Sequence, residues 1–287
     1  MIQMNHVHKT YPSQKFALSD ITLEISEGEF VYIAGPNGSG KTTLLRILFG
    51  TERPTSGEVI VNGMDITEKN FHNVYLLRRT IGIVFQDFKL LKNRTVSENI
   101  RFALEVTGHP REEAEKRVSE ILSWIGLQGR ERDLIVTLSA GEQQRVAIAR
   151  SLINDPPILL ADEPTGDLDA QMTKDIMGIF NSLHLKGTTI VFATHNVDLI
   201  KRYPYRTIIL LDGKRADGKK NEEMRVGGCS LFSCMSCGAF FKIPRETSSQ
   251  TWLRSVLLPS LFSSFRLLPL SRSISPPFSR FGKIRLK

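Results

Sequence analysis

The chain is poor in cysteine, and the few cysteines it has are confined to its last quarter. Only three occur in 287 residues, Cys229, Cys234 and Cys237. The first 213 residues therefore contain no disulfide framework of the kind that holds many small secreted proteins together. This distribution fits a protein that works in a reducing compartment.

Long apolar runs are also missing. No stretch reaches the roughly 18 to 20 apolar residues that a membrane-spanning helix needs. Residues 1–11 lack the apolar core of a signal peptide. The most apolar part of the C-terminal region, residues 252–270, is interrupted by two arginines and two prolines. Any role at a membrane is therefore expected to depend on a partner protein.

Most of the chain lacks an excess of charge, although the formal net charge is +8. Residues 214–287 hold 14 Lys and Arg against 4 Asp and Glu, whereas residues 1–213 hold 24 against 26. Because the basic charge is confined to the C-terminal segment, it gives no indication that the body binds nucleic acid. No nucleic-acid partner is expected.

Short apolar runs alternate with helical patterns along the first 213 residues. Continuous apolar runs are typical of strands buried on both faces of a parallel sheet; they occupy residues 30–34, 81–85, 158–161, 189–193 and 207–211. Apolar residues then recur at three- and four-residue spacing within 97–107 and 111–125. We predict an α/β domain over residues 1–213 with a helical subdomain at about 87–150. Residues 214–287 are predicted to be a basic, largely disordered tail.

A glycine-rich loop follows the first of these strands. It reads Gly35, Pro36, Asn37, Gly38, Ser39, Gly40, Lys41, Thr42 and Thr43, and it leads into a helical pattern. A strand, this loop and a helix in that order are typical of a P-loop. Glycines let backbone N–H groups approach phosphate oxygens, and the helix N-terminus adds a positive end. Lys41 is expected to contact the β- and γ-phosphates of ATP, and the Thr42 hydroxyl to bind Mg²⁺.

Two adjacent carboxylates, Asp162 and Glu163, follow the apolar run at 158–161. Paired acids at the end of a buried strand are costly without a cation. We predict that Asp162 holds Mg²⁺, directly or through its water shell, and that Glu163 polarises the water that attacks ATP. The alternative is that both are solvated loop acids.

The segment 138–145, Leu-Ser-Ala-Gly-Glu-Gln-Gln-Arg, resembles the signature of ABC-type ATPases. In that family the signature of one subunit contacts the γ-phosphate bound by the other, so the resemblance implies a homodimer that encloses two ATP molecules. The implied contacts come from Ser139, Ala140, Gly141 and Glu142. Ser139 is also a suitable N-cap for the following helix. Ala140 stands where the signature usually has glycine, and its methyl group would cost about 1 kcal/mol if that position required a positive φ.

Four further positions match the ABC pattern. Gln86 corresponds to the family glutamine that touches Mg²⁺ and the attacking water, and His195 to the histidine that bonds the γ-phosphate. With Glu163 they form the implied catalytic set. Asp169 corresponds to a loop at the dimer interface, and Tyr11 to the aromatic residue that stacks on adenine. Structural alternatives, such as helix capping by Asp169 and packing by Tyr11, remain open.

Within the ABC-type ATPases, the body from residue 2 to about 214 is similar to the cell-division ATPases of the FtsE family. Segments 77–87, 142–146, 160–166 and 193–200 carry this similarity. It implies a P-loop cassette with a mostly parallel central sheet, an N-terminal antiparallel part and an inserted helical subdomain. It also implies ATP and Mg²⁺ as ligands, an FtsX-like integral membrane permease as partner, a position at the cytoplasmic face of the cell membrane, and control of cell-wall hydrolysis.

Other functions stay open at this stage. The segment 160–166 is shared with ATPases of lipoprotein-release and macrolide or peptide exporters, which gives the first alternative. A soluble ABC protein acting on DNA or ribosomes would usually show a tandem cassette or a long coiled-coil insertion. A scaffold that does not hydrolyse ATP should have lost Lys41, Glu163 or His195, all of which are present.

The C-terminal segment 214–287 has three open interpretations. It could be an unstructured extension, such as the product of a frame-shifted coding end. Its basic and apolar residues could instead lie against anionic lipid. The C-x₄-C-x₂-C spacing of its cysteines suggests an iron–sulfur loop, but such a loop needs a fourth cysteine.

Overall fold

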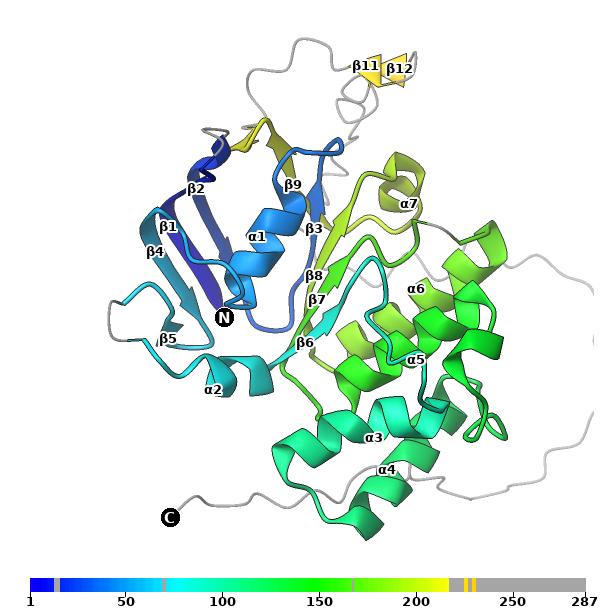
Figure 1. Ribbon diagram of the computed structural model, residues 1–287. Coiled ribbons are helices and arrows are strands. Elements are labelled where there is room, and N and C mark those ends of the chain that lie inside the picture. Colours follow the sequence, from blue (N-terminus) through cyan, green and yellow to red (C-terminus); the bar gives the residue numbers. More distant parts are fainter. Residues whose placement is uncertain (13–15, 69–70, 167, 217–224, 227–228, 231–287) are drawn as a thin grey trace, which may run out of the picture. The chain divides into compact units, whose positions relative to one another are not determined.

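The computed structural model describes residues 1–12, 16–68, 71–166, 168–216, 225–226 and 229–230 (Figure 1). All of them belong to one unit, Met1–Cys237. The predicted tail lies mostly outside the described residues, so its disorder stays a prediction. Two short strands within it, β11 (Arg225–Val226) and β12 (Cys229–Ser230), pair with each other in antiparallel fashion.

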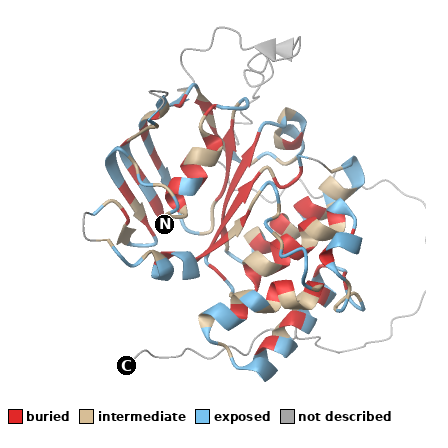
Figure 2. Cartoon of the chain, in the orientation of Figure 1, coloured by how far each residue is buried: buried red, intermediate tan, exposed pale blue. Residues whose placement is uncertain are grey.

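The central sheet is formed by the apolar runs that the sequence predicts as strands, and its order is β10-β9-β3-β8-β7-β6. Its parallel members are β3 (Phe30–Ala34), β6 (Ile81–Val84), β7 (Ile158–Asp162), β8 (Thr189–Thr194) and β9 (Arg206–Leu211). At one edge β10 (Lys214–Arg215) pairs antiparallel with β9. Every residue of β3, β7 and β8 is buried, because layers cover both faces of the sheet (Figure 2).

A second sheet is antiparallel, and in the sequence two of its strands come before the P-loop helix and two after it. It has the order β2-β1-β4-β5 and consists of β1 (Ile2–Thr10), β2 (Phe16–Ile25), β4 (Ser56–Val61) and β5 (Met64–Asp65). Helix α1 (Lys41–Leu48) lies between the two sheets in Figure 1. One apolar cluster joins all three layers, and Ile21, Leu44 and Val191 represent them within it.

Helices cover the other face of the central sheet. They are α5 (Ala140–Leu152), α6 (Ala170–Leu185) and α7 (Val197–Arg202), while the short α2 (Val74–Arg79) precedes β6. The buried rings of Phe180 on α6 and Phe192 on β8 meet edge to face, with their centroids 5.1 Å apart. No helix within the described ranges is both long and apolar enough to cross a bilayer.

The predicted helical subdomain is present between β6 and β7. It contains α3 (Val96–Thr107), α4 (Arg111–Trp124), a 3₁₀ turn at Ile135–Thr137 and α5, and it buries its own apolar cluster. Thr95 caps α3 through reciprocal bonds with Glu98, and Gly108 ends this helix in a left-handed conformation. The α/β class, the antiparallel part and the helical insertion are thereby confirmed. The predicted division at residue 213 stays a prediction.

Phe180→Ala tests the packing of α6 against the sheet. Because this ring is fully buried, we expect the free energy of unfolding to fall by about 3–5 kcal/mol in urea titrations. Leu185→Ala is the matched control, since this leucine is on the same helix but 87% exposed, and it should change stability by about 0.5 kcal/mol or less. Equal losses in the two variants would contradict the described packing.

Candidate functional site

Four parallel strands end at one edge of the central sheet, and each leads into residues predicted for the site. The glycine-rich loop follows β3, His195 follows β8, Asp162 ends β7 just before Glu163, and Gln86 comes two residues after β6. Because β3, β8, β7 and β6 are neighbours in this order, their carboxyl ends meet at the same edge. Residues far apart in the sequence are therefore brought together by the parallel topology.

The loop needs glycine at two positions where other backbone comes close. At Gly35, which has a φ of 155°, a Cβ would lie 2.2 Å from the carbonyl oxygen of Leu210. At Gly40, with a φ of 104°, it would lie 2.5 Å from the carbonyl oxygen of Ala17. The loop is thus held between β9 and β2, and substitution at either position would force the backbone apart.

Lys41, at the first position of α1, is buried together with a carboxylate. Its Nζ donates hydrogen bonds to the carbonyl oxygens of Gly35 at 2.9 Å and Pro36 at 3.0 Å. Glu163 Oε1 lies 3.4 Å from the same nitrogen, and the two side chains are 5% and 11% exposed. An anion that enters the loop would therefore meet an ammonium group that is already oriented.

Asp162 is a buried carboxylate, and it contacts the Thr42 hydroxyl. Thr42 Oγ1 donates to Asp162 Oδ1 at 3.3 Å. Burial raises the pKa of Asp162, and the Thr42 hydrogen bond opposes this rise. A buried carboxylate that is poorly solvated, next to a hydroxyl oxygen, is a donor pair of the kind that Mg²⁺ prefers. These two residues thus fit the predicted metal.

Glu163 links the loop to the end of β8. Its Oε2 lies 2.8 Å from Nδ1 of His195, whose side chain is 48% exposed. The backbone of Glu163 has a φ of 47°, which is uncommon outside glycine, and its N–H donates to the carbonyl oxygen of Ala193 at 3.0 Å. A backbone strained in this way is often found at functional sites. Here it aims the carboxylate between Lys41 and His195.

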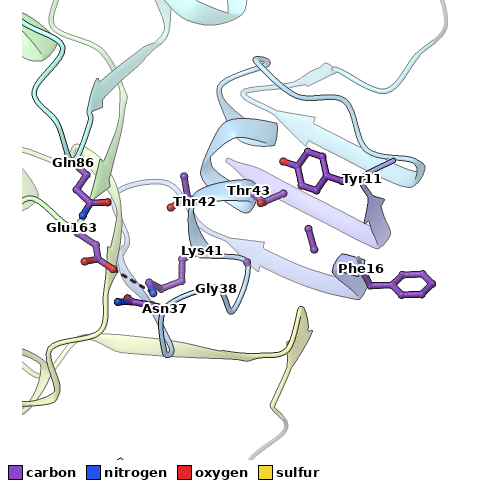
Figure 3. Close-up of a pocket in the computed structure, with 11 residues that line it drawn as sticks. Tyr11, Phe16, Asn37, Gly38, Lys41, Thr42, Thr43, Gln86 and Glu163 are labelled. Atoms are coloured by element: carbon purple, nitrogen blue, oxygen red, sulfur yellow. Dashed lines mark ion pairs between the residues drawn. The ribbon is translucent and has the colours of Figure 1, made fainter. Parts of the chain in front are cut away.

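A cavity of about 450 Å³ opens beside these groups, and this volume is typical of a small-molecule site (Figure 3). It is lined by Tyr11, Phe16, Ala17, Asn37, Gly38, Gly40, Lys41, Thr42, Thr43, Gln86 and Glu163. The sequence missed Phe16 and Ala17, which become neighbours of the loop only through the pairing of β2. Two predicted residues, Asp162 and His195, are not part of this lining, but each contacts a residue that is. Asp162 accepts a hydrogen bond from Thr42, and His195 lies next to Glu163.

The signature residues do not line the cavity of their own chain as far as it is described. Ser139 caps α5: its Oγ accepts from the N–H of Glu142 at 3.4 Å, and Glu142 Oε2 accepts from the N–H of Ser139 at 2.9 Å. The hydrogen bonds that the Glu142 carboxylate accepts from the N–H and the hydroxyl of Ser139, supported by Arg130, lower the pKa of Glu142. The capping role is thus real, and a contact with the partner's ATP stays a prediction.

Ala140 and Gly141 are the first two residues of α5. Ala140 is the first residue of this right-handed helix, so the conditional cost of a positive φ does not arise for its methyl group. At Gly141 a Cβ would lie 2.6 Å from Sδ of Met172 on α6, a close approach that the sequence did not reveal. Asp169 caps α6 by accepting from the N–H of Met172 at 2.8 Å, while its interface role remains untested.

Comparisons with known proteins agree with this geometry. A family model described as ABC transporter matches residues 18–166. The cell division ATP-binding protein FtsE of Bacillus subtilis (strain 168) is 43% identical over 213 residues, which cover 74% of this chain and 93% of that protein. The FtsE protein of Mycobacterium tuberculosis (strain ATCC 25618 / H37Rv) is 45% identical over 215 residues, covering 75% and 94%.

Solved structures show the same likeness. A bacterial ABC transporter cassette solved as a dimer superposes with a TM-score of 0.70 at 39% identity, covering 79% of this chain and all of that one. A second structure of the same cassette, a dimer in a post-hydrolysis state bound to ADP and Pi, superposes with a TM-score of 0.70 at 37% identity over the same shares.

Asp162→Asn tests the electrostatic cost of the buried carboxylate. Because burial raises the pKa of Asp162, the folded state binds its proton more tightly than the unfolded state does. This stabilising contribution is complete below the unfolded pKa of about 3.9 and is lost as pH rises through the folded pKa. We therefore expect Asp162→Asn to raise the free energy of unfolding of the ligand-free protein at pH 7.5.

At pH 4.5 the gain from Asp162→Asn should be smaller, because ionisation then costs the native protein less. Urea titrations at the two pH values measure both quantities. A loss of stability of equal size at both pH values would contradict the assigned direction of the pKa.

Proposed function

The chain belongs to the ATP-hydrolysing subunits of the ABC transporter family, and from this membership we propose that it energises a cell-division complex of the FtsE and FtsX kind. In this proposal it works as a homodimer at the cytoplasmic face of the cell membrane. An FtsX-like permease carries the motion across the membrane to control cell-wall hydrolysis.

One observation supports the catalytic part of the proposal above all others. The Glu163 carboxylate lies between Lys41 and His195, at the wall of a cavity bordered by the glycine-rich loop. This arrangement joins a phosphate-binding group to a candidate base within one site. The cell-division part is supported by the identity of 40–45% with the FtsE proteins of three bacterial species, Escherichia coli (strain K12) among them.

Binding of ATP is assigned to the loop and to α1. Backbone N–H groups of the loop and the N-terminus of α1 would surround the β- and γ-phosphates, and Lys41 would exchange part of its contact with Glu163 for a phosphate oxygen. Tyr11 would stack on adenine. Thr42, Asp162 and Gln86 would hold Mg²⁺, which when bound neutralises phosphate charge.

Hydrolysis is assigned to Glu163, Gln86 and His195. Glu163 would accept a hydrogen bond from the attacking water and draw off its proton as the water oxygen bonds to the γ-phosphorus and the bond to the β-phosphate oxygen breaks. Gln86 would orient this water. His195, whose Nδ1 is already 2.8 Å from Glu163, would donate to the γ-phosphate and so keep the base and the phosphate in register.

Coupling to a partner is assigned to dimer closure. Cassettes of this family form dimers and pair with membrane permease components, and one solved relative of this chain is a dimer in two structures. In our proposal Ser139, Ala140, Gly141 and Glu142 contact the ATP of the partner subunit, with Asp169 at the interface. Closure would need ATP at both sites, and loss of the γ-phosphate would let the dimer open.

Glu163→Gln tests the catalytic assignment. We expect this variant to bind ATP and dimerise, while its ATP turnover falls about 100-fold or more because the base is lost. Glu58→Gln is the matched control, since this glutamate is exposed and bonds Asn5 on the antiparallel sheet. Turnover is measured as phosphate release. Normal turnover in Glu163→Gln would remove Glu163 from the mechanism.

The partner is tested by isolating the Glu163→Gln chain from native membranes in the presence of ATP and identifying the proteins that copurify. We expect an FtsX-like permease, because ATP held without hydrolysis favours the closed complex. A lipoprotein-release or drug-export permease would move the chain to that transporter class, and only non-membrane partners would overturn the membrane role. A parallel chain that ends at residue 213 shows whether residues 214–287 contribute to binding.

A further inference from the structure

A lysine lies against the aromatic ring at the outer end of the cavity. Nζ of Lys9 is 5.1 Å from the centroid of the Tyr11 ring, which is within the range of a cation–π contact. Lys9 lies near the end of β1, and Tyr11 directly follows this strand. In Figure 3 the Tyr11 ring stands beyond Thr43, away from Glu163.

Lys9 is itself held in place by two partners. Its Nζ lies 2.8 Å from Glu52 Oε2 and donates to the carbonyl oxygen of Arg53 at 2.8 Å. The Lys9 side chain is only 13% exposed and that of Glu52 28%. The charge of Lys9 is thus engaged by its neighbours, and in the described structure Lys41 lines the cavity whereas Lys9 does not. Lys9 is therefore suited to fix a ring and not to bind phosphate.

The partners of Lys9 belong to the segment that directly follows α1. The N–H of Glu52 donates to the carbonyl oxygen of Arg46 in the last turn of this helix at 3.3 Å. Thr55 then fastens the segment to β1: its N–H donates to the carbonyl oxygen of His8 at 2.7 Å, and its Oγ1 accepts from the N–H of Thr10 at 3.0 Å. Helix α1 therefore carries Lys41 at its first residue, and the segment that follows its last turn holds Lys9 against the ring of Tyr11.

Two aromatic side chains line the cavity, and among the contacts of the described residues Tyr11 is the one that has this support. Phe16 is 63% exposed at the start of β2, whereas Tyr11 is less exposed and carries the Lys9 contact. A ring that is already oriented loses less side-chain entropy when a flat ligand stacks on it. The support from Lys9 thus singles out Tyr11 as the stacking surface.

We propose that Lys9, which Glu52 and the Arg53 carbonyl hold in place, is a positioning residue for the nucleotide base. It holds the Tyr11 ring in the orientation that stacks on the base and at a fixed distance from the phosphate loop. This inference rests on the proposed ATP site and adds a residue to it. The base is recognised by its flat aromatic face. Lys9 acts through Tyr11 and touches neither the base nor the phosphates.

The test compares a ligand that has a base with one that has none. Binding of ATP and of inorganic tripolyphosphate is measured by calorimetry for the unaltered protein, Lys9→Met, Tyr11→Leu and the double variant. Methionine keeps an unbranched apolar side chain but removes the charge. We expect Lys9→Met to weaken ATP binding roughly fivefold and to leave tripolyphosphate binding unchanged. In the Tyr11→Leu background the same substitution should have no further effect.

Two more variants separate positioning from general damage. Lys9→Arg keeps a cation against the ring and should retain ATP affinity. Asn5→Ala removes a cross-strand bond to Glu58, which is 2.8 Å long and joins β1 to β4, and should not change ATP affinity. If Lys9→Met does not fold, Glu52→Gln takes its place, because it releases the clamp while keeping the lysine.

The outcomes are distinguishable from those of the proposed function. If the unaltered chain does not bind ATP, both the proposed function and this inference fail. If it binds ATP but Lys9→Met binds equally well, loses tripolyphosphate affinity to the same extent, or weakens ATP binding further in the Tyr11→Leu background, the positioning role is overturned and the ATP site stands.

Discussion

The contact on which the site depends most is the carboxylate of Glu163 between Lys41 and His195. A lysine that is only 5% exposed must have its charge compensated, and in the described structure Glu163 and two loop carbonyls provide this compensation. The same carboxylate reaches the residue after β8. One largely buried side chain thereby ties together the ends of three strands, and its unusual backbone conformation is the cost of this position.

Helix α1 relates the two sheets to each other and to the cavity. Its apolar residues pack between the sheets, in the cluster that includes Leu44 and Leu48. Its first residue is Lys41, and the segment after its last turn is fastened to β1. Because a helix of this length is stiff and rises about 1.5 Å per residue, the spacing between the phosphate loop and the end of β1 is set by the packing of α1.

The start of α5 shows how one segment satisfies local needs and remains available for a partner. Ser139 and Glu142 cap the helix with reciprocal bonds, which stabilises the helix whether or not a second subunit is present. Gly141 lies beside the Met172 side chain, so the start of α5 also meets the first turn of α6. In the proposed dimer the same residues, Ser139 to Glu142, would face the ATP of the partner subunit.

The sequence alone determined the strands of the central sheet and the kinds of side chain at their ends, because apolar runs, glycines and paired acids are local signals. It predicted β3 at residues 30–34, the loop from Gly35 to Thr42, and the carboxylates at the end of β7. Only the tertiary structure decided which groups touch: Glu163 with His195, Lys9 with Tyr11, and Gly141 with Met172. Strand order and sheet pairing set these contacts through long-range packing, and no short stretch of sequence encodes them.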